Sequence, residues 1–172
     1  MRPGPQRAGR RLLAQVDGVS CGPSVLVATA ALTGSGWPGA VAGRFGRAQR
    51  LAHRQANRWW PRALGTTPFG MRRWLHRHAP AAGRFRIRPW SSATSRAVAA
   101  AAAAGHPVPL LVGSVWLPRH WVLVIRAGER GWEVYEPSSG EVRLLAPGTL
   151  VTRSATPVLG WPRAYCALVP RP

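Results

Sequence analysis

Hydrophobic and polar positions change their period about halfway along the chain. Residues 21–32 are small or apolar with hardly a break, which predicts a buried helix that begins at or next to Cys21 and stops at the glycines of 34–36. In residues 38–60 apolar side chains recur at helical spacing opposite a row of arginines, which predicts an amphipathic helix. A third helix is expected over 67–78, because it starts with a Thr cap and a Pro in the first turn.

The second half of the chain has mainly the period of strands. Residues 84–90 alternate, and an Ala-rich helix is predicted to follow from Ser91 or Ser92 to about Ala104. Helices first and mostly antiparallel strands afterwards make an α+β fold, in which the N-terminal helical part packs on the sheet. Further strands are predicted at 106–116, 120–127, 132–136, 141–145 and 164–169, with turns at 128–131 and 137–140 and a Pro- and Gly-broken stretch at 147–162.

The organisation of the chain follows from these patterns. Residues 1–12 are rich in Pro, Gly and Arg without periodicity, and we expect a flexible basic arm. Residues 13–172 show neither an internal repeat nor a linker, which predicts a single domain. Since no apolar window of about 18 residues and no signal-peptide pattern is present, the expected location is cytoplasmic, without a transmembrane segment.

Charge is the most unusual feature of the composition. The chain has 24 basic residues, all of them Arg, against 5 acidic ones, for a net charge of +19. Codon usage in a GC-rich genome explains Arg in place of Lys but not the scarcity of acids, and so large a charge attracts polyanions such as nucleic acid or anionic lipid. The candidate surface is the arginine row of the second helix, beside Trp59 and Trp60: Arg47, Arg50, Arg54 and Arg58. A solvated helix face is the alternative interpretation.

The same composition limits the chemistry. Five acids argue against catalysis by paired carboxylates and against a carboxylate-rich metal site, and the absence of Lys excludes a Schiff base and a P-loop. His76 and His78 have no acidic or thiol partner nearby in the sequence, so we expect them on the surface and not in a metal site. We therefore expect neither a metal nor another cofactor, and we expect the reactive side chains to be cysteine and histidine.

Cys21 is the candidate nucleophile. A thiol at a helix N-terminus feels the positive end of the helix dipole and nearby free N–H groups, and both favour the thiolate. Gly22 follows it and is expected to leave the backbone open to a substrate. Gln15 lies six residues earlier, where its amide NH2 and the Cys21 N–H would form an oxyanion hole. The other cysteine, Cys166, lies in an apolar strand and is expected to be buried.

His120 is the candidate base. It opens a buried strand just after a turn, so it is expected at the rim of the sheet. If the strands 120–127 and 132–136 pair as a hairpin, their far ends meet, and this places Glu136 beside His120 as the acceptor that orients the imidazole. The alternative interpretation is a solvated Glu at the end of a strand.

These residues resemble the papain-like cysteine peptidases, most closely the bacteriocin-processing peptidases that cleave double-glycine leaders. The matching residues are Gln15, Cys21, Gly22, His120, Trp121, Tyr135 and Pro137, within a resemblance that extends over about residues 13–170. The resemblance implies a papain-like fold with Cys21 as nucleophile, His120 as base, Glu136 as third member and Gln15 in the oxyanion hole, and with Gly22 and Trp121 at the substrate. The sequence departs from the family at Glu136, where the family usually has Asp, and at Ser20, where the family often has an acid.

Two classes of function remain open at this point. The first is a peptidase or amidase that acts on a peptide or protein by acyl transfer, and the same residues also serve acyltransferases and transglutaminases. The second is a catalytically inactive, peptidase-like binding module whose arginine helix holds nucleic acid or another polyanion, with an anionic membrane as a weaker variant.

Overall fold

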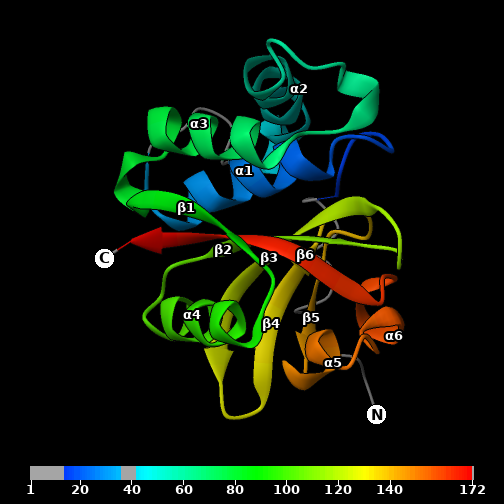
Figure 1. The fold of residues 1–172 in the computed structure, drawn as a ribbon. Helices are drawn as coiled ribbons and strands as arrows, with labels where there is room; N and C mark the ends of the chain where they lie inside the picture. The colour runs from blue at the N-terminus through cyan, green and yellow to red at the C-terminus, as the bar shows by residue number, and fades with distance from the viewer. Residues whose placement is uncertain (1–13, 36–41, 172) are drawn as a thin grey trace, which may run out of the picture.

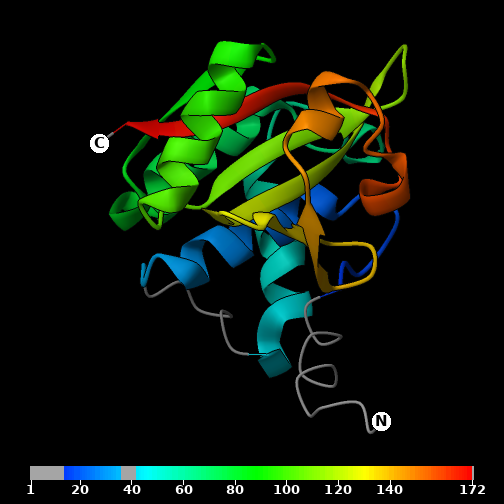
Figure 2. The same cartoon turned by 90° about the horizontal axis from the view of Figure 1, so that it is seen from below.

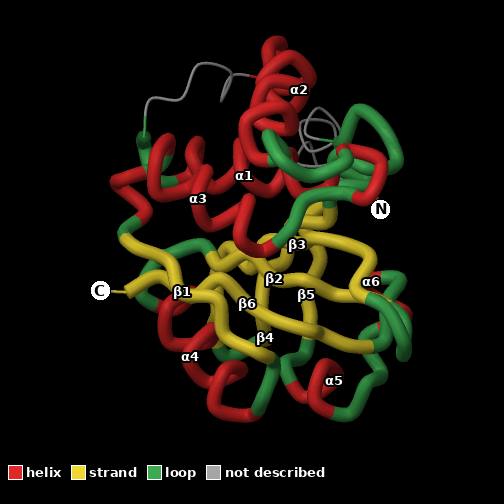
Figure 3. The backbone as a smooth tube through the Cα atoms, turned by 45° about the horizontal axis from the view of Figure 1, so that its top comes forward, coloured by secondary structure: helices red, strands yellow, loops and turns green. Residues whose placement is uncertain are grey.

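A computed structural model describes residues 14–35 and 42–171. Three long helices come first along the chain: α1 (Cys21–Leu32), α2 (Phe45–Ala56) and α3 (Pro68–His78). They gather on one face of a six-stranded antiparallel sheet, above it in Figures 1 and 3. Single 3-10 turns accompany them at Ala42–Arg44, Arg62–Leu64 and Pro80–Ala82.

Each of these helices forms for a local reason. α1 is apolar on all sides and is almost entirely buried, because α2, α3 and the sheet surround it. α2 buries Phe45, Ala48 and Ala52 on one side and exposes its arginines on the other. α3 begins where the Thr67 hydroxyl accepts a hydrogen bond from the Gly70 N–H at 3.1 Å, with Pro68 in the first turn.

The sheet has the strand order β1-β6-β2-β3-β4-β5, and every neighbouring pair is antiparallel. The last strand of the chain is inserted between the first two, while β2 to β5 follow one another as a meander. The strands are β1 (Arg84–Pro89), β2 (Val108–Gly113), β3 (Pro118–Gly128), β4 (Gly131–Glu136), β5 (Glu141–Leu145) and β6 (Arg163–Arg171).

A second helical layer covers the other face of the sheet. It contains α4 (Ser92–Ala103) and the short α5 (Gly148–Val151), and α6 (Thr156–Leu159) lies beside it. Figure 2, viewed from below, shows α4 lying across the strands. Two apolar clusters result, one between α1–α3 and the sheet and one between the sheet and α4–α6. The central strands β2 and β6 are therefore buried on both faces, whereas the edge strands β1 and β5 are largely exposed or half-buried.

The α+β expectation, with helices N-terminal to a largely antiparallel sheet, is confirmed. The helix predicted over 38–60 is shorter than expected, because α2 begins at Phe45 and ends at Ala56, before the exposed Trp59 and Trp60. The stretch 147–162, for which no element was predicted, contains α5 and α6. The predicted arm 1–12 and residues 36–41 lie outside the described residues. In the described part of the chain, no helix has the length and apolar character needed to cross a membrane.

Candidate active site

Cys21 occupies the first position of α1, as the sequence predicts. The residue is 5% exposed and its thiol is not in a disulfide. The preceding Ser20 is held by two hydrogen bonds with the main chain of Asp17, at 3.1 Å from the Asp17 N–H to Ser20 Oγ and at 3.1 Å from Ser20 Oγ to the Asp17 carbonyl. The entry to α1 is therefore a fixed turn, and the thiol has a fixed place at the helix N-terminus.

His120 and Glu136 come from the neighbouring strands β3 and β4. Their side chains are in contact, with His120 Nε2 at 2.6 Å from Glu136 Oε1, and both are buried. The hairpin that joins the two strands pairs Leu123 with Tyr135, so the far ends of the strands meet as expected. The distance is that of a short, charge-assisted hydrogen bond.

Cys21 is the second group beside the His120 imidazole, after Glu136. Burial alone would lower the pKa of His120, but side-chain hydrogen bonds with Cys21 and Glu136 and electrostatic interaction with both residues raise it to about 9. Because Glu136 is at Nε2, Nδ1 is the ring nitrogen that remains for the thiol. The imidazole thus lies between a sulfur and a carboxylate, and it stays protonated at neutral pH.

Glu136 is held in place independently of the histidine. Its Oε1 accepts the Ser138 N–H and its Oε2 accepts the Ser139 N–H, each at 3.0 Å. Burial would raise the pKa of this carboxyl, but the hydrogen bonds with His120, Ser138 and Ser139 and the charge of His120 lower it to about 2. The extra methylene relative to Asp is accommodated by the turn 137–140, whose N–H groups close around the carboxylate.

Gln15 lies next to this pair. Its backbone N–H donates to the Pro137 carbonyl at 2.7 Å, directly after Glu136, and its side-chain Nε2 donates to the Asp17 carbonyl at 2.8 Å. The segment that leads into α1 is therefore attached to the end of β4. The amide lies in the loop that precedes Cys21, and its role in an oxyanion hole stays a prediction.

Gln49 is a site residue that the sequence did not reveal. It is fully buried on α2, where its Oε1 accepts the Val16 N–H at 3.0 Å and the Ser24 hydroxyl at 2.8 Å, and its Nε2 donates to the Ala14 carbonyl at 3.0 Å. These hydrogen bonds hold the peptide groups on both sides of Gln15 and join them to α1. In the sequence this glutamine is one polar residue in an arginine-rich helix, which gives no sign of its role.

Replacing Gln49 with alanine is expected to displace the Gln15 segment. We predict that catalytic turnover falls about tenfold or more, while the alkylation rate of Cys21 stays within about twofold, because the thiol and imidazole do not depend on Gln49. Unfolding in urea gives the stability cost separately. Gln55→Ala is the matched control, since Gln55 lies on the same helix and accepts a hydrogen bond from Trp74 Nε1 without touching residues 14–20. Equal losses in both variants would show a general effect on α2.

Gly22 and Trp121 have other surroundings than those expected of substrate-binding residues. Gly22 is buried, and a Cβ there would lie 2.9 Å from the Cβ of Thr66, so the glycine allows Thr66 to pack against α1. Trp121 is 2% exposed, and its indole N–H donates to the Thr66 carbonyl at 2.8 Å. Both residues are in contact with or next to Thr66 in the core, and their contact with a substrate stays a prediction.

The remaining candidates are distributed over the surface and core. The four arginines of the predicted basic face, Arg47, Arg50, Arg54 and Arg58, are exposed as expected. Arg58 lies 5.4 Å from the ring centroid of Trp59, which is 80% exposed. His53 lies on α2 but is only 6% exposed, and burial lowers its pKa. His76 is exposed but has a structural role, since its Nε2 accepts the Phe85 N–H at 2.8 Å.

The comparisons with known proteins give this site no precedent. No protein-family model matches the chain, and no curated protein sequence matches it. The arrangement of Cys21, His120 and Glu136 is therefore the observation from which a function is argued.

Proposed function

We propose that this chain is a cysteine peptidase or amidase of papain-like fold that cleaves by acyl transfer. The observation that carries the proposal is the buried imidazole of His120, which hydrogen-bonds Cys21 on one side and Glu136, at 2.6 Å, on the other. A thiol, an imidazole and a carboxylate in this order are the groups that nucleophilic catalysis requires. The order of elements supports the papain-like assignment: the nucleophile begins the first helix, and the base and acid follow on adjacent antiparallel strands.

The reaction would run in two steps. In the first, the Cys21 thiolate attacks the substrate carbonyl carbon, and the His120 imidazolium gives its proton to the leaving amine as the C–N bond breaks. In the second, the neutral imidazole takes a proton from water, and the resulting hydroxide attacks the thioester and releases the acid and the thiol. Glu136 holds the imidazole and stabilises its charged form. The Cys21 N–H and the Gln15 amide are the donors we assign to the oxyanion.

The loop before His120 favours a peptide as substrate. Val115, Trp116 and Leu117 are 49%, 86% and 50% exposed, although a large apolar side chain is usually covered. The loop is nevertheless well held, because Tyr165 Oη donates to the Ser114 carbonyl at 2.8 Å and the Trp116 and Leu117 N–H groups donate to Ser114 Oγ. An ordered apolar ridge a few residues from the base is suited to contact side chains of a chain substrate that flank the bond to be cleaved.

The test of the proposal is cleavage of a complex peptide pool. The purified protein is incubated with peptides from a digested proteome, and new termini are identified by mass spectrometry. Cleavage by the wild type that is absent with Cys21→Ala supports the proposal. If the wild type produces neither new termini nor an acyl-enzyme on Cys21, hydrolysis of peptides is ruled out for this chain under the conditions tested.

Trp116 allows the substrate contact to be tested separately. Trp116→Ala is expected to raise KM about tenfold and to leave kcat within about twofold, because it removes binding that ground state and transition state share. Leu144→Ala is the matched control, since Leu144 is 53% exposed on β5, where it pairs with Glu133 three residues before Glu136. Initial rates over a range of concentrations of one cleaved peptide give both constants. An unchanged KM for Trp116→Ala would contradict the assignment of the loop.

A further inference from the structure

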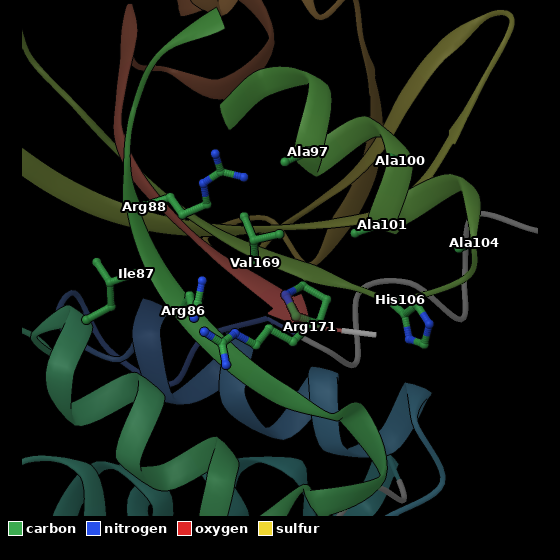
Figure 4. Close-up of a pocket in the computed structure, with 11 residues that line it drawn as sticks. Arg86, Ile87, Arg88, Ala97, Ala100, Ala101, Ala104, His106, Val169 and Arg171 are labelled. Carbon is green, nitrogen blue, oxygen red and sulfur yellow. The ribbon is translucent and has the colours of Figure 1, made fainter. Parts of the chain in front are cut away.

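A second site lies on the opposite face of the sheet. A half-open cavity of about 740 Å³ lies between β1, the end of β6 and α4 (Figure 4). β6 runs from Arg163, opposite Gly113, to Arg171, so this end of the strands is remote from the one where His120 stands opposite Val112. The cavity is therefore separate from the candidate active site, and nothing in the proposed reaction uses it.

The polar side chains that line this cavity are all basic. They are Arg86 and Arg88 from β1, Arg171 from β6 and His106 after α4. Arg86 and Arg88 lie on the same face of β1, and Arg171 is the cross-strand partner of Arg84, so like charges are neighbours there. Such an arrangement is destabilising unless an anion joins it.

The fold supplies no acidic side chain to balance these arginines. Of the five acids in the sequence, Asp17 lies in the loop before α1, and the others lie in or next to β4 and β5, at the edge of the sheet farthest from β1: Glu129, Glu133, Glu136 and Glu141. The described residues form no ion pair with Arg86, Arg88 or Arg171. An anionic ligand in the cavity would therefore meet arginines without an opposing carboxylate side chain among the described residues.

The rest of the lining is aliphatic. Ala97 and Ala101 present the side of α4, with Val169 of β6 between them and Arg88 in Figure 4. None of the lining residues carries a hydroxyl, amide, carboxylate or aromatic ring other than the imidazole of His106. A sugar or a nucleobase would find no side-chain amide or hydroxyl and no large ring to stack on, whereas an alkyl chain would find apolar walls.

The edge of β1 is closed to an added peptide strand. The outward-facing N–H groups of β1 belong to alternate residues. His76 already accepts the Phe85 N–H at 2.8 Å, and Pro89 has no N–H, so the Ile87 N–H is the remaining donor along the outer edge. This favours a small molecule within the cavity over a peptide that extends the sheet.

We propose that this cavity binds a small anionic amphiphile, that is, a single carboxylate or phosphate headgroup on an aliphatic chain. The headgroup is held by Arg86, Arg88 and Arg171, and the chain lies along the alanine side of α4 over Val169. Guanidinium groups suit both headgroups because they donate paired N–H bonds to two oxygens.

The probe for this site is octyl phosphate below its micelle concentration, titrated into the full chain by calorimetry at physiological ionic strength. We expect one saturable site, with an affinity about tenfold or more above that of inorganic phosphate, because the phosphate alone leaves the apolar walls unused. Octanol, which lacks the charge, is expected to bind more weakly by a similar factor. Equal affinity for octyl phosphate and inorganic phosphate would overturn the proposal.

Two variants locate the probe in the cavity. Arg88→Gln combined with Arg171→Gln is expected to weaken octyl phosphate about tenfold or more, through the loss of charge-assisted hydrogen bonds. Ala101→Phe keeps every charge and fills the cavity, and is expected to weaken octyl phosphate but not inorganic phosphate. Arg126→Gln combined with Arg130→Gln, in and beside the β3–β4 turn, removes the same charge elsewhere and is expected to change affinity less than about twofold.

The outcomes separate a site from general attraction to a basic protein. Equal weakening by both double-arginine variants would show that net charge alone attracts the probe, and the proposal would fail. Vesicles of phosphatidylglycerol form a second arm: if they bind the protein and its Arg88/Arg171 variant equally while octyl phosphate does not, bilayer attraction is distinct from the cavity. Thermal unfolding of each variant shows that it is folded before it is titrated.

Discussion

At pH 6 iodoacetamide is expected to modify Cys21 and to leave Cys166 unmodified, and replacing His120 with alanine is expected to remove this preference. Cys166 is an internal reference, since burial raises the pKa of its thiol to about 11. The His120 imidazolium, with a pKa of about 9, is positively charged and lies beside Cys21, where it activates the sulfur as a nucleophile. In His120→Ala the alkylation rate of Cys21 at pH 6 should fall about tenfold or more, because this activation of the sulfur is lost.

Peptide mapping by mass spectrometry after timed quenching measures both rates in one sample. A free thiol of a short peptide provides the rate of an unactivated cysteine. Alkylation of Cys21 that is no faster than this peptide at pH 6, or that is unchanged in His120→Ala, would contradict the proposed nucleophile. This measurement needs no substrate, so it tests the reactive pair even where the peptide to be cleaved is unknown.

The second large effect is expected from Glu136→Gln. The carboxylate and its hydrogen bond help to hold the pKa of His120 at about 9, so the neutral amide should lower the pH at which the imidazole loses its proton by at least about one unit. Turnover of a cleaved peptide should fall about 100-fold or more, since the imidazole loses its orienting anion. Titration of the His120 ring protons by NMR gives the midpoint, and the alkaline limb of the pH–rate profile should move with it.

Glu141→Gln is the matched control for this change. Glu141 lies five residues later, its side chain is 51% exposed, and its substitution removes the same charge. The role assigned to Glu136 would be contradicted if the midpoint of the His120 titration moved equally in both variants or in neither.

The same two groups predict how stability depends on pH. The pKa of Glu136 is lowered from 4.5 to about 2, so its contribution is complete above about pH 4.5 and is lost as the pH falls through about 2. The pKa of His120 is raised from 6.5 to about 9, so its contribution is complete below about pH 6.5 and is lost as the pH rises through about 9. The pair therefore stabilises the fold most between these ranges, and Glu136→Gln should flatten both limbs.

Much of the secondary structure could be predicted because its signals are local. Thr67-Pro68 begins α3 and Ser91 caps α4, where its hydroxyl accepts the Thr94 N–H at 3.1 Å. The position of β6 could not be predicted, since its insertion between β1 and β2 depends on pairing between segments far apart in the chain. Periodicity identifies a strand but does not choose its neighbours.

The candidate site shows the same division. The contact between His120 and Glu136 follows from a single hairpin, so the count of residues along two adjacent strands was sufficient. Gln49 and Thr66 could not be found in this way, because each acts through contacts with segments brought together only by the packing of α1, α2 and β3. For the same reason the contacts of Gly22 and Trp121 with Thr66 could not be predicted from the sequence.

The three groups of the proposed active site come from two layers that are joined by tertiary contacts. Cys21 belongs to the helical layer, whereas His120 and Glu136 belong to the sheet. A compact state that kept its helices and its hairpin but lost the packing between layers would keep the histidine–glutamate pair and lose the thiol beside it. The reactivity of Cys21 would then report docking of the helices on the sheet. The thiol would not be activated until this last stage of folding.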